Sequence, residues 1–178
     1  MSQDQKDVAL KSKTAIAYHE AGHSVAACLA HKRFRIVSIL PNEESMGRCI
    51  IVQWKSFHPD YETSRRTRYR IKADIFMLLA GPCAEYKYVG GRKPVYSVKD
   101  YQEARELASY LCGSQEEADA YVEYMWEQTK NIISLDWNWK AIVAVANALL
   151  GQKTLKYLKT LHLIRKASDK VTPRIDLL

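Results

Sequence analysis

Apolar residues recur at the spacing of amphipathic helices along most of this chain. A first helix is predicted over about residues 14–31, where alanine and other small residues are frequent. A second is predicted over about residues 62–88, and Pro82 is expected to kink or break it because proline lacks a backbone N–H donor. Ser114 and Glu117 have the spacing of a helix capping box. Four shorter helices are predicted over about residues 97–112, 114–133, 137–150 and 155–166.

Two short runs have the composition of β-strands, Phe34–Leu40 and Arg48–Trp54. The residues between them, 41–47, include proline, asparagine and glycine, which favour turns. We therefore expect a hairpin or two short strands. The predicted fold class is mainly α (α+β), with a small β-hairpin or sheet beside the helices.

The domain organisation follows from the same pattern. Residues 1–13 are polar and charged and are expected to form a disordered tail. Residues 14–168 are expected to form a single domain, because the chain contains no linker, repeat or low-complexity tract. Within it we expect one lobe over about 14–112 and a C-terminal helical lobe over about 113–168.

The composition indicates the cellular environment of the protein more than its function. The chain has 178 residues, of which 47% are hydrophobic, and a net charge of +7 that suits several anionic partners without selecting one. Its four cysteines form no CxxC pair, which argues against a zinc finger or a thioredoxin-type site. No signal peptide is apparent, and the longest apolar run, Ala141–Leu150, is too short for a membrane span. We expect a cytoplasmic protein with free thiols.

The most informative residues are His19, Glu20 and His23, which form an HExxH motif inside the first predicted helix. Residues four apart lie on the same face of an α-helix, so His19 and His23 can direct two imidazoles at one metal ion. Glu20 then lies beside the first ligand, where it can contact a metal-bound water. The motif predicts a zinc site with Glu20 as the catalytic base.

A catalytic zinc site needs a third protein ligand. The extended HExxHxxGxxH motif is excluded, because Ala26 and Leu29 occupy the positions of its glycine and last histidine. His31 lies about 80° further round the helix than His23, so it is expected to point elsewhere. The residues alone leave four candidates open: Glu85, Asp100, Glu103 and His162.

Three segments, in this order, resemble the peptidase domain of the FtsH family of zinc metalloproteases. They are TAIAYHEAGHSV (Thr14–Val25), LAGPCAE (Leu79–Glu85) and SVKDYQEA (Ser97–Ala104). The residues from Ala146 to Leu163 also look like the final helices of that family. The resemblance implies an FtsH-peptidase-like fold and one Zn²⁺ per chain. It further implies that Asp100 is the third zinc ligand and that Glu85 orients a zinc-binding histidine.

The chain departs from the family pattern at three positions near these motifs: Pro82 replaces an arginine, Tyr86 a glutamate and Lys99 an asparagine. It also has no GxxxxGK[ST] phosphate loop, although the family joins its peptidase to an ATPase motor and a membrane anchor. We therefore expect the peptidase part alone, with a partner ATPase or a homo-oligomer compatible with the sequence.

The predicted function is zinc-dependent endopeptidase activity on unfolded or extended polypeptides, independent of ATP by itself. The substrate is expected to pair with a strand formed by Arg48, Cys49, Ile50, Ile51 and Val52. One alternative is a catalytically weak or inactive metal-binding scaffold with a regulatory role. A nucleic-acid-binding module is less favoured, because the basic stretch Arg65–Lys72 has no helix-turn-helix or similar module beside it.

Overall fold

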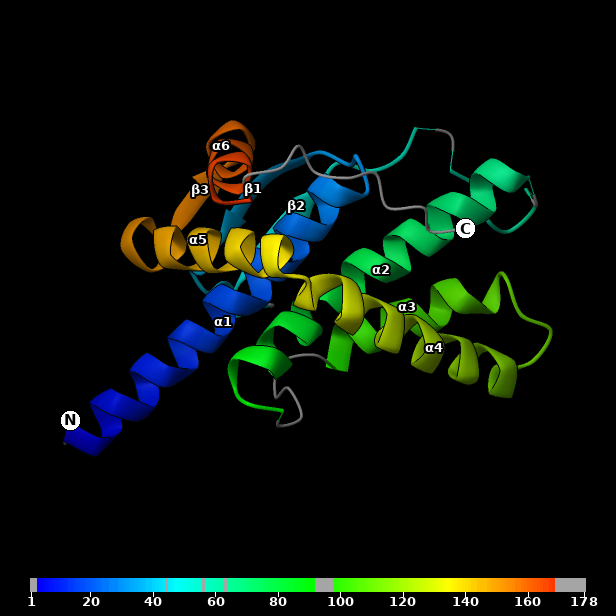
Figure 1. The fold of residues 1–178 in the computed structure, drawn as a ribbon. Helices are drawn as coiled ribbons and strands as arrows, with labels where there is room; N and C mark the ends of the chain where they lie inside the picture. Colours follow the sequence, from blue (N-terminus) through cyan, green and yellow to red (C-terminus); the bar gives the residue numbers. More distant parts are fainter. Residues whose placement is uncertain (1–2, 44, 56, 63, 92–97, 169–178) are drawn as a thin grey trace.

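The computed structural model describes residues 3–43, 45–55, 57–62, 64–91 and 98–168. Within these ranges it contains six helices and three short strands (Figure 1), which confirms the predicted mainly α fold with a small sheet. The elements, in order, are α1 (Gln3–Leu29), β1 (Phe34–Ser38), β2 (Arg48–Ile51), α2 (Arg65–Tyr88), α3 (Val98–Ser109), α4 (Gln115–Ser134), α5 (Asp136–Gln152), β3 (Thr154–Lys156) and α6 (Tyr157–Ala167).

Helix α1 organises the molecule, because it packs against both α2 and α5. On one side α2 contacts α3 and α4, and on the other the sheet lies with α5 and α6 (Figure 1). The close crossing of α1 and α2 depends on small residues: a Cβ added at Gly22 would lie 2.8 Å from the Cβ of Ala84. The glycine in the HExxH segment therefore lets the two helices that carry the site approach each other.

The sheet is antiparallel, with strand order β2-β1-β3. The hairpin prediction is confirmed for β1 and β2, although both strands end earlier than expected. Strand β3 was not predicted, because Leu155 and Lys156 were assigned to the last helix. Its three residues become a strand only by pairing with Ile36–Ser38, a contact between distant parts of the chain that no local pattern shows. In this order β2 is an edge strand.

Two helix predictions need correction. Helix α1 begins at Gln3, so the disordered tail expected over residues 1–13 is helical from that residue; its sequence contains neither glycine nor proline to prevent this. Helix α2 continues through Pro82 to Tyr88, so the proline does not break it. Residues Leu79–Glu85 around it are all buried, and this packing outweighs the lost backbone hydrogen bond.

The capping prediction at the start of α4 is confirmed at its N-cap. The hydroxyl of Ser114 accepts a hydrogen bond from the backbone N–H of Glu117 at 3.2 Å. The Glu117 carboxylate accepts from the backbone N–H of Gly113 at 2.6 Å, one residue before the position that a capping box requires.

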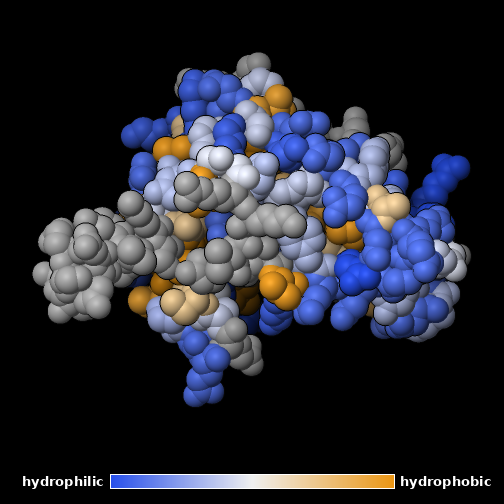
Figure 2. Space-filling model, turned by 90° about the horizontal axis from the view of Figure 1, so that it is seen from below, coloured by the Kyte–Doolittle hydropathy of each residue, from blue (hydrophilic) through white to orange (hydrophobic). Residues whose placement is uncertain are grey.

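Among the described residues, no helix has both the length and the apolar character required to cross a bilayer. Figure 2 shows one face of the molecule, on which hydrophilic residues predominate and hydrophobic residues emerge in small separate groups.

Candidate metal centre and active-site cleft

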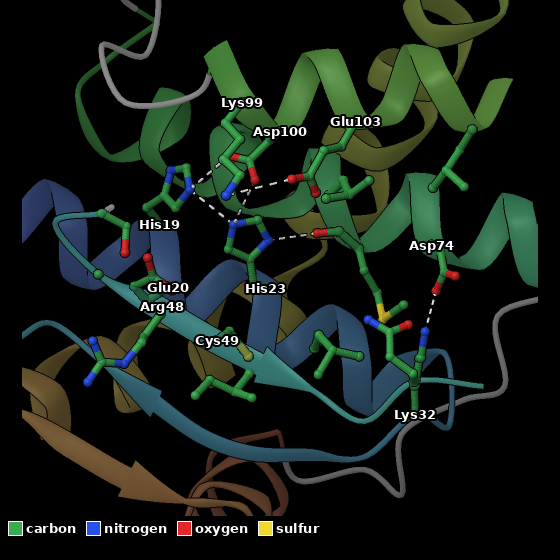
Figure 3. A pocket seen from close by; sticks show the side chains of 18 of the residues that line it. His19, Glu20, His23, Lys32, Arg48, Cys49, Asp74, Lys99, Asp100 and Glu103 are labelled. Atoms are coloured by element: carbon green, nitrogen blue, oxygen red, sulfur yellow. Dashed lines mark hydrogen bonds and ion pairs between the residues drawn. The ribbon is translucent and has the colours of Figure 1, made fainter. Parts of the chain in front are cut away.

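Three side chains from two helices converge at one point (Figure 3). The Nε2 atoms of His19 and His23, both on α1, are 3.0 Å apart. The carboxylate of Asp100, in the first turn of α3, lies 3.2 Å from Nε2 of His19 and 3.6 Å from Nε2 of His23. A tetrahedral zinc ion with bonds of about 2.0–2.1 Å separates its ligand atoms by roughly 3.3 Å. The three donors therefore have the types and separations that zinc requires.

The other ring nitrogen of each histidine is held by α2. Nδ1 of His19 lies 3.0 Å from the carboxylate of Glu85, which is buried. Nδ1 of His23 lies 2.8 Å from the backbone carbonyl of Met77, and because a carbonyl only accepts, this nitrogen carries the proton. Because both Nδ1 atoms are held by these acceptors, the two Nε2 atoms face the side of Asp100 and would be the atoms that bind a metal ion, as in metal sites where an outer partner fixes the orientation of the ring.

Glu20 lies beside this cluster and is 5% exposed. Its Oε2 atom is buried and has no hydrogen-bond partner among the described residues. Burial raises the pKa of Glu20 to about 8, against the opposing effect of His19. A buried carboxylate oxygen without a partner is costly in a folded protein and calls for an explanation in function. A divalent ion bound beside it would favour the charged form of Glu20, and this oxygen would then be placed to receive a proton from a water molecule in the cleft.

The charges around the cluster favour a cation at its centre. Burial lowers the pKa of His19, but hydrogen bonds to Asp100 and Glu85 outweigh it and raise this pKa to about 10. Burial lowers the pKa of His23. The pKa of Asp100 is lowered despite burial, because His23 and His19 stabilise its charged form. In the metal-free protein the proton on His19 supplies the positive charge that a divalent ion would supply when bound.

Two glycines that the sequence reasoning did not single out make room for these side chains. A Cβ at Gly81 would overlap the imidazole of His23, with its Cε1 only 2.6 Å away. A Cβ at Gly47, just before β2, would lie 2.6 Å from Oε1 of Glu20. Gly81 lies inside the second family-like segment, which was the available signal; Gly47 lies in the turn between the predicted strands and had none.

A cleft of about 1020 Å³ extends from the metal cluster between β2 and α3. Four of the five predicted substrate-binding residues, Arg48 to Ile51, form β2 and line this cleft. Val52 lies beyond the end of β2, is 44% exposed and does not line the cleft. Among the alternative ligands, Glu103 lines the cleft outside the three-residue cluster, and His162 is exposed on α6.

The three departures from the family pattern leave the cluster intact. The side chain of Lys99 is 72% exposed and lies 3.9 Å from Glu103. Tyr86 packs edge-on against Trp126, with ring centroids 5.8 Å apart, and Pro82 is buried within α2. None of the three is among the described residues that hydrogen-bond to the imidazoles of His19 and His23.

Comparison with known proteins adds independent support. The family model for peptidase family M41 matches residues 6–112. Over 169 residues the chain is 27% identical to the ATP-dependent zinc metalloprotease FtsH of Streptobacillus moniliformis, covering 93% of this chain and 23% of that protein. Over 98 residues it is 32% identical to the protein of the same name from Syntrophus aciditrophicus, covering 54% of this chain and 12% of that protein. The chain therefore spans less than a quarter of the length of these relatives.

The range matched by the family model contains α1 with both histidines, strands β1 and β2, α2 with Glu85, and α3 with Asp100. The metal cluster and the cleft thus lie within the matched residues. With more than half of its length matched, the chain belongs to peptidase family M41 and carries an FtsH-type peptidase domain.

Proposed function

We propose that this protein is a zinc-dependent endopeptidase that hydrolyses peptide bonds in unfolded or extended polypeptides. The observation that carries the proposal is the convergence of His19, His23 and Asp100 beside the buried Oε2 of Glu20, which has no hydrogen-bond partner within the described ranges. Metal donors and a base meet at one end of a cleft of about 1020 Å³. Membership of family M41 supports the same chemistry.

His19, His23 and Asp100 would hold one Zn²⁺ ion. When bound, zinc supplies a Lewis acid that polarises a substrate carbonyl and lowers the pKa of water to about 7. Glu85 and the carbonyl of Met77 hold the two imidazoles by their Nδ1 atoms and so keep both rings oriented.

Glu20 would act as the general base and then as the general acid. Its Oε2 accepts a proton from the attacking water and returns it to the nitrogen of the leaving amine. Burial raises the proton affinity of this carboxylate, which favours holding the proton between the two steps. Gly47 allows β2 to approach Glu20 closely and so brings the substrate strand next to the base.

The substrate would bind as an extended segment along β2. This strand lies at the edge of the sheet, so its outer N–H and C=O groups are available to a further strand. Such main-chain pairing depends little on sequence and needs an unfolded or flexible segment. The chain has no GxxxxGK[ST] loop, so we propose that unfolding of folded substrates is done by a separate ATPase domain or partner.

The test combines metal content with peptide cleavage. We expect one zinc per wild-type chain and chelator-sensitive cleavage of an unstructured peptide. Glu20→Gln should keep the zinc and lose cleavage, and Asp100→Ala should lose most of the zinc. Full zinc occupancy with no cleavage of peptides or casein would instead support the metal-binding scaffold, and wild-type activity in Glu20→Gln would remove Glu20 as the base.

A further inference from the structure

The cleft continues beyond the metal cluster to a second group of charged residues. On α2, Asp74 lies three residues before Met77, whose carbonyl accepts from His23. On α3, Glu103 lies three residues after Asp100. Three residues of helix correspond to about 4.5 Å along the axis. Asp74 therefore lies about one turn from the residue that holds His23, and Glu103 about one turn from Asp100; both line the cleft on the same side of the metal cluster (Figure 3).

Asp74 is fixed by hydrogen bonds to only one of its two carboxylate oxygens. Its Oδ1 accepts from Nζ of Lys32 at 2.6 Å and from the indole N–H of Trp54 at 3.1 Å. Its other oxygen, Oδ2, has no hydrogen-bond partner in the part of the chain that the structure describes. The side chain is 14% exposed and faces the cleft. One carboxylate oxygen thus remains available to a bound molecule.

The cation of this group, Lys32, is not available to a bound molecule. The side chain of Lys32 is 4% exposed, its Nζ is bonded to Asp74, and it lies 4.5 Å from the ring centroid of Trp54. Glu103, by contrast, is half-exposed, and its ion pair with Lys99 is long at 3.9 Å. Apart from Lys99, whose solvent-exposed side chain also lines the cleft, the charges that a ligand can reach in this part of the cleft are carboxylates.

The cleft is also lined by apolar side chains. Met77 and Leu78 of α2, Leu107 of α3 and Ile51 of β2 line the cleft. A side chain that fits needs an apolar stem of several carbon atoms and a cationic tip. Lysine and arginine have this form, because their methylene stems pack on apolar surfaces while the charged ends reach polar groups.

We infer that the cleft selects a lysine or arginine side chain of the substrate, close to the cleaved bond, by contacts with Asp74 and Glu103. The inference rests on the proposed peptidase function and adds a preference for basic residues to it. The cation would lie between Oδ2 of Asp74 and the carboxylate of Glu103, with its stem against Met77 and Leu107. Both acids act in binding and take no part in bond cleavage.

The test measures binding separately from cleavage. Zinc-loaded Glu20→Gln protein is titrated with three fluorescent peptides of eight residues that differ at one central position: arginine, norleucine or glutamate. The flanking residues are alanine, so the peptide can slide and present its one variable side chain to the cleft. We expect the arginine peptide to bind about fivefold more tightly than the norleucine peptide, and the glutamate peptide to bind most weakly.

Variants at Glu103 decide whether the carboxylate is responsible. Added to the Glu20→Gln protein, Glu103→Gln should remove most of the preference, and Glu103→Lys should make the glutamate peptide bind more tightly than the arginine peptide. Glu123→Gln removes the same charge from an exposed site on α4 outside the cleft and should change nothing. In cleavage by otherwise wild-type protein, Glu103→Gln should raise KM for the arginine peptide with little effect on kcat.

Two outcomes separate this inference from the proposed function. Equal binding of the three peptides, or an equal loss of preference in Glu123→Gln, would overturn the inference even if all peptides are cleaved. A clear preference for arginine that follows Glu103, in a protein that cleaves no peptide, would uphold the inference and reject the proposed activity.

Discussion

The two ends of the cleft contain similar charged side chains in opposite arrangements. At one end, His19, His23 and Asp100 point toward a common centre and leave it to be filled by a cation. At the other, Lys32 and Asp74 pair with each other at 2.6 Å. Burial lowers the pKa of Lys32 and raises that of Asp74, so each buried charge depends on its partner. The first end is arranged for an added metal ion, whereas at the second end Lys32 already pairs with one oxygen of Asp74.

The largest effect on stability is expected at the paired end. Asp74→Ala leaves the ammonium of Lys32 buried without its partner, and removing one member of a buried ion pair costs about 3–5 kcal/mol. Denaturant unfolding of the purified variant measures this loss. The double variant Lys32→Met/Asp74→Leu should recover most of it, because an apolar pair of similar size avoids the buried charge. A double variant as unstable as Asp74→Ala would show that shape, and not charge, matters at this end.

The metal end should show its dependence on pH when no metal is bound. The pKa of His19 in the folded protein is about 10, above its ordinary 6.5, so its stabilising effect is complete below pH 6.5 and is lost as the pH rises through 10. The pKa of Glu20 is about 8, above its ordinary 4.5, so its protonated form also stabilises the folded protein. This contribution is likewise lost as the pH rises through 8. Metal-free protein should therefore lose on the order of 1 kcal/mol per pH unit between pH 7 and 9.

Urea unfolding at pH 6, 7, 8 and 9, with a chelator and then with zinc, measures this trend. His19→Gln should make the metal-free profile less steep, since only Glu20 of the two groups then remains. With zinc, the imidazole binds in its neutral form, so the slope should be much smaller. A metal-free protein whose stability rises from pH 7 to 9 would contradict the charge arrangement described for this end.

The two ends also differ in how much of each could be predicted from the sequence. His19 and His23 were found because helix geometry alone puts residues four apart on one face. Asp100 and Glu85 are distant in sequence from both, and geometry left four candidates, so only the family resemblance singled out these two. Nothing pointed to the pairing of Lys32 with Asp74, because 42 residues separate them and neither belongs to a motif.

The same holds for the fold: sequence patterns predicted what depends on neighbouring residues and missed what depends on distant contacts. The helix over Arg65–Tyr88 was predicted almost to its ends, because its apolar periodicity lies within one segment. Strand β3 was missed because its three residues are set by a partner more than a hundred residues away. The break expected at Pro82 did not occur, since the burial of the surrounding turns depends on helices that a local reading does not place.

A smaller effect is expected from filling the space beside His23. Gly81→Ala places a methyl group in the volume of the imidazole, so the ring must move away from its position opposite Asp100. We expect zinc affinity to fall about 10- to 100-fold, comparable to the loss of an outer-shell partner. Competition with a coloured chelator measures it. Gly151→Ala is the matched control, because a Cβ there meets no atom within 4 Å and should leave zinc affinity unchanged.

The smallest effect is expected from a substitution at Lys99, beside the metal cluster. Lys99 stands beside Asp100 where the family pattern has asparagine, and a cation next to a zinc ligand would be expected to weaken metal binding. Its side chain is 72% exposed, however, and lies 3.9 Å from Glu103, so solvent screens its charge. Lys99→Asn should change zinc affinity by less than about twofold. It should also free Glu103 and strengthen the binding of an arginine peptide, whereas a large gain in zinc affinity would place Lys99 with the metal end.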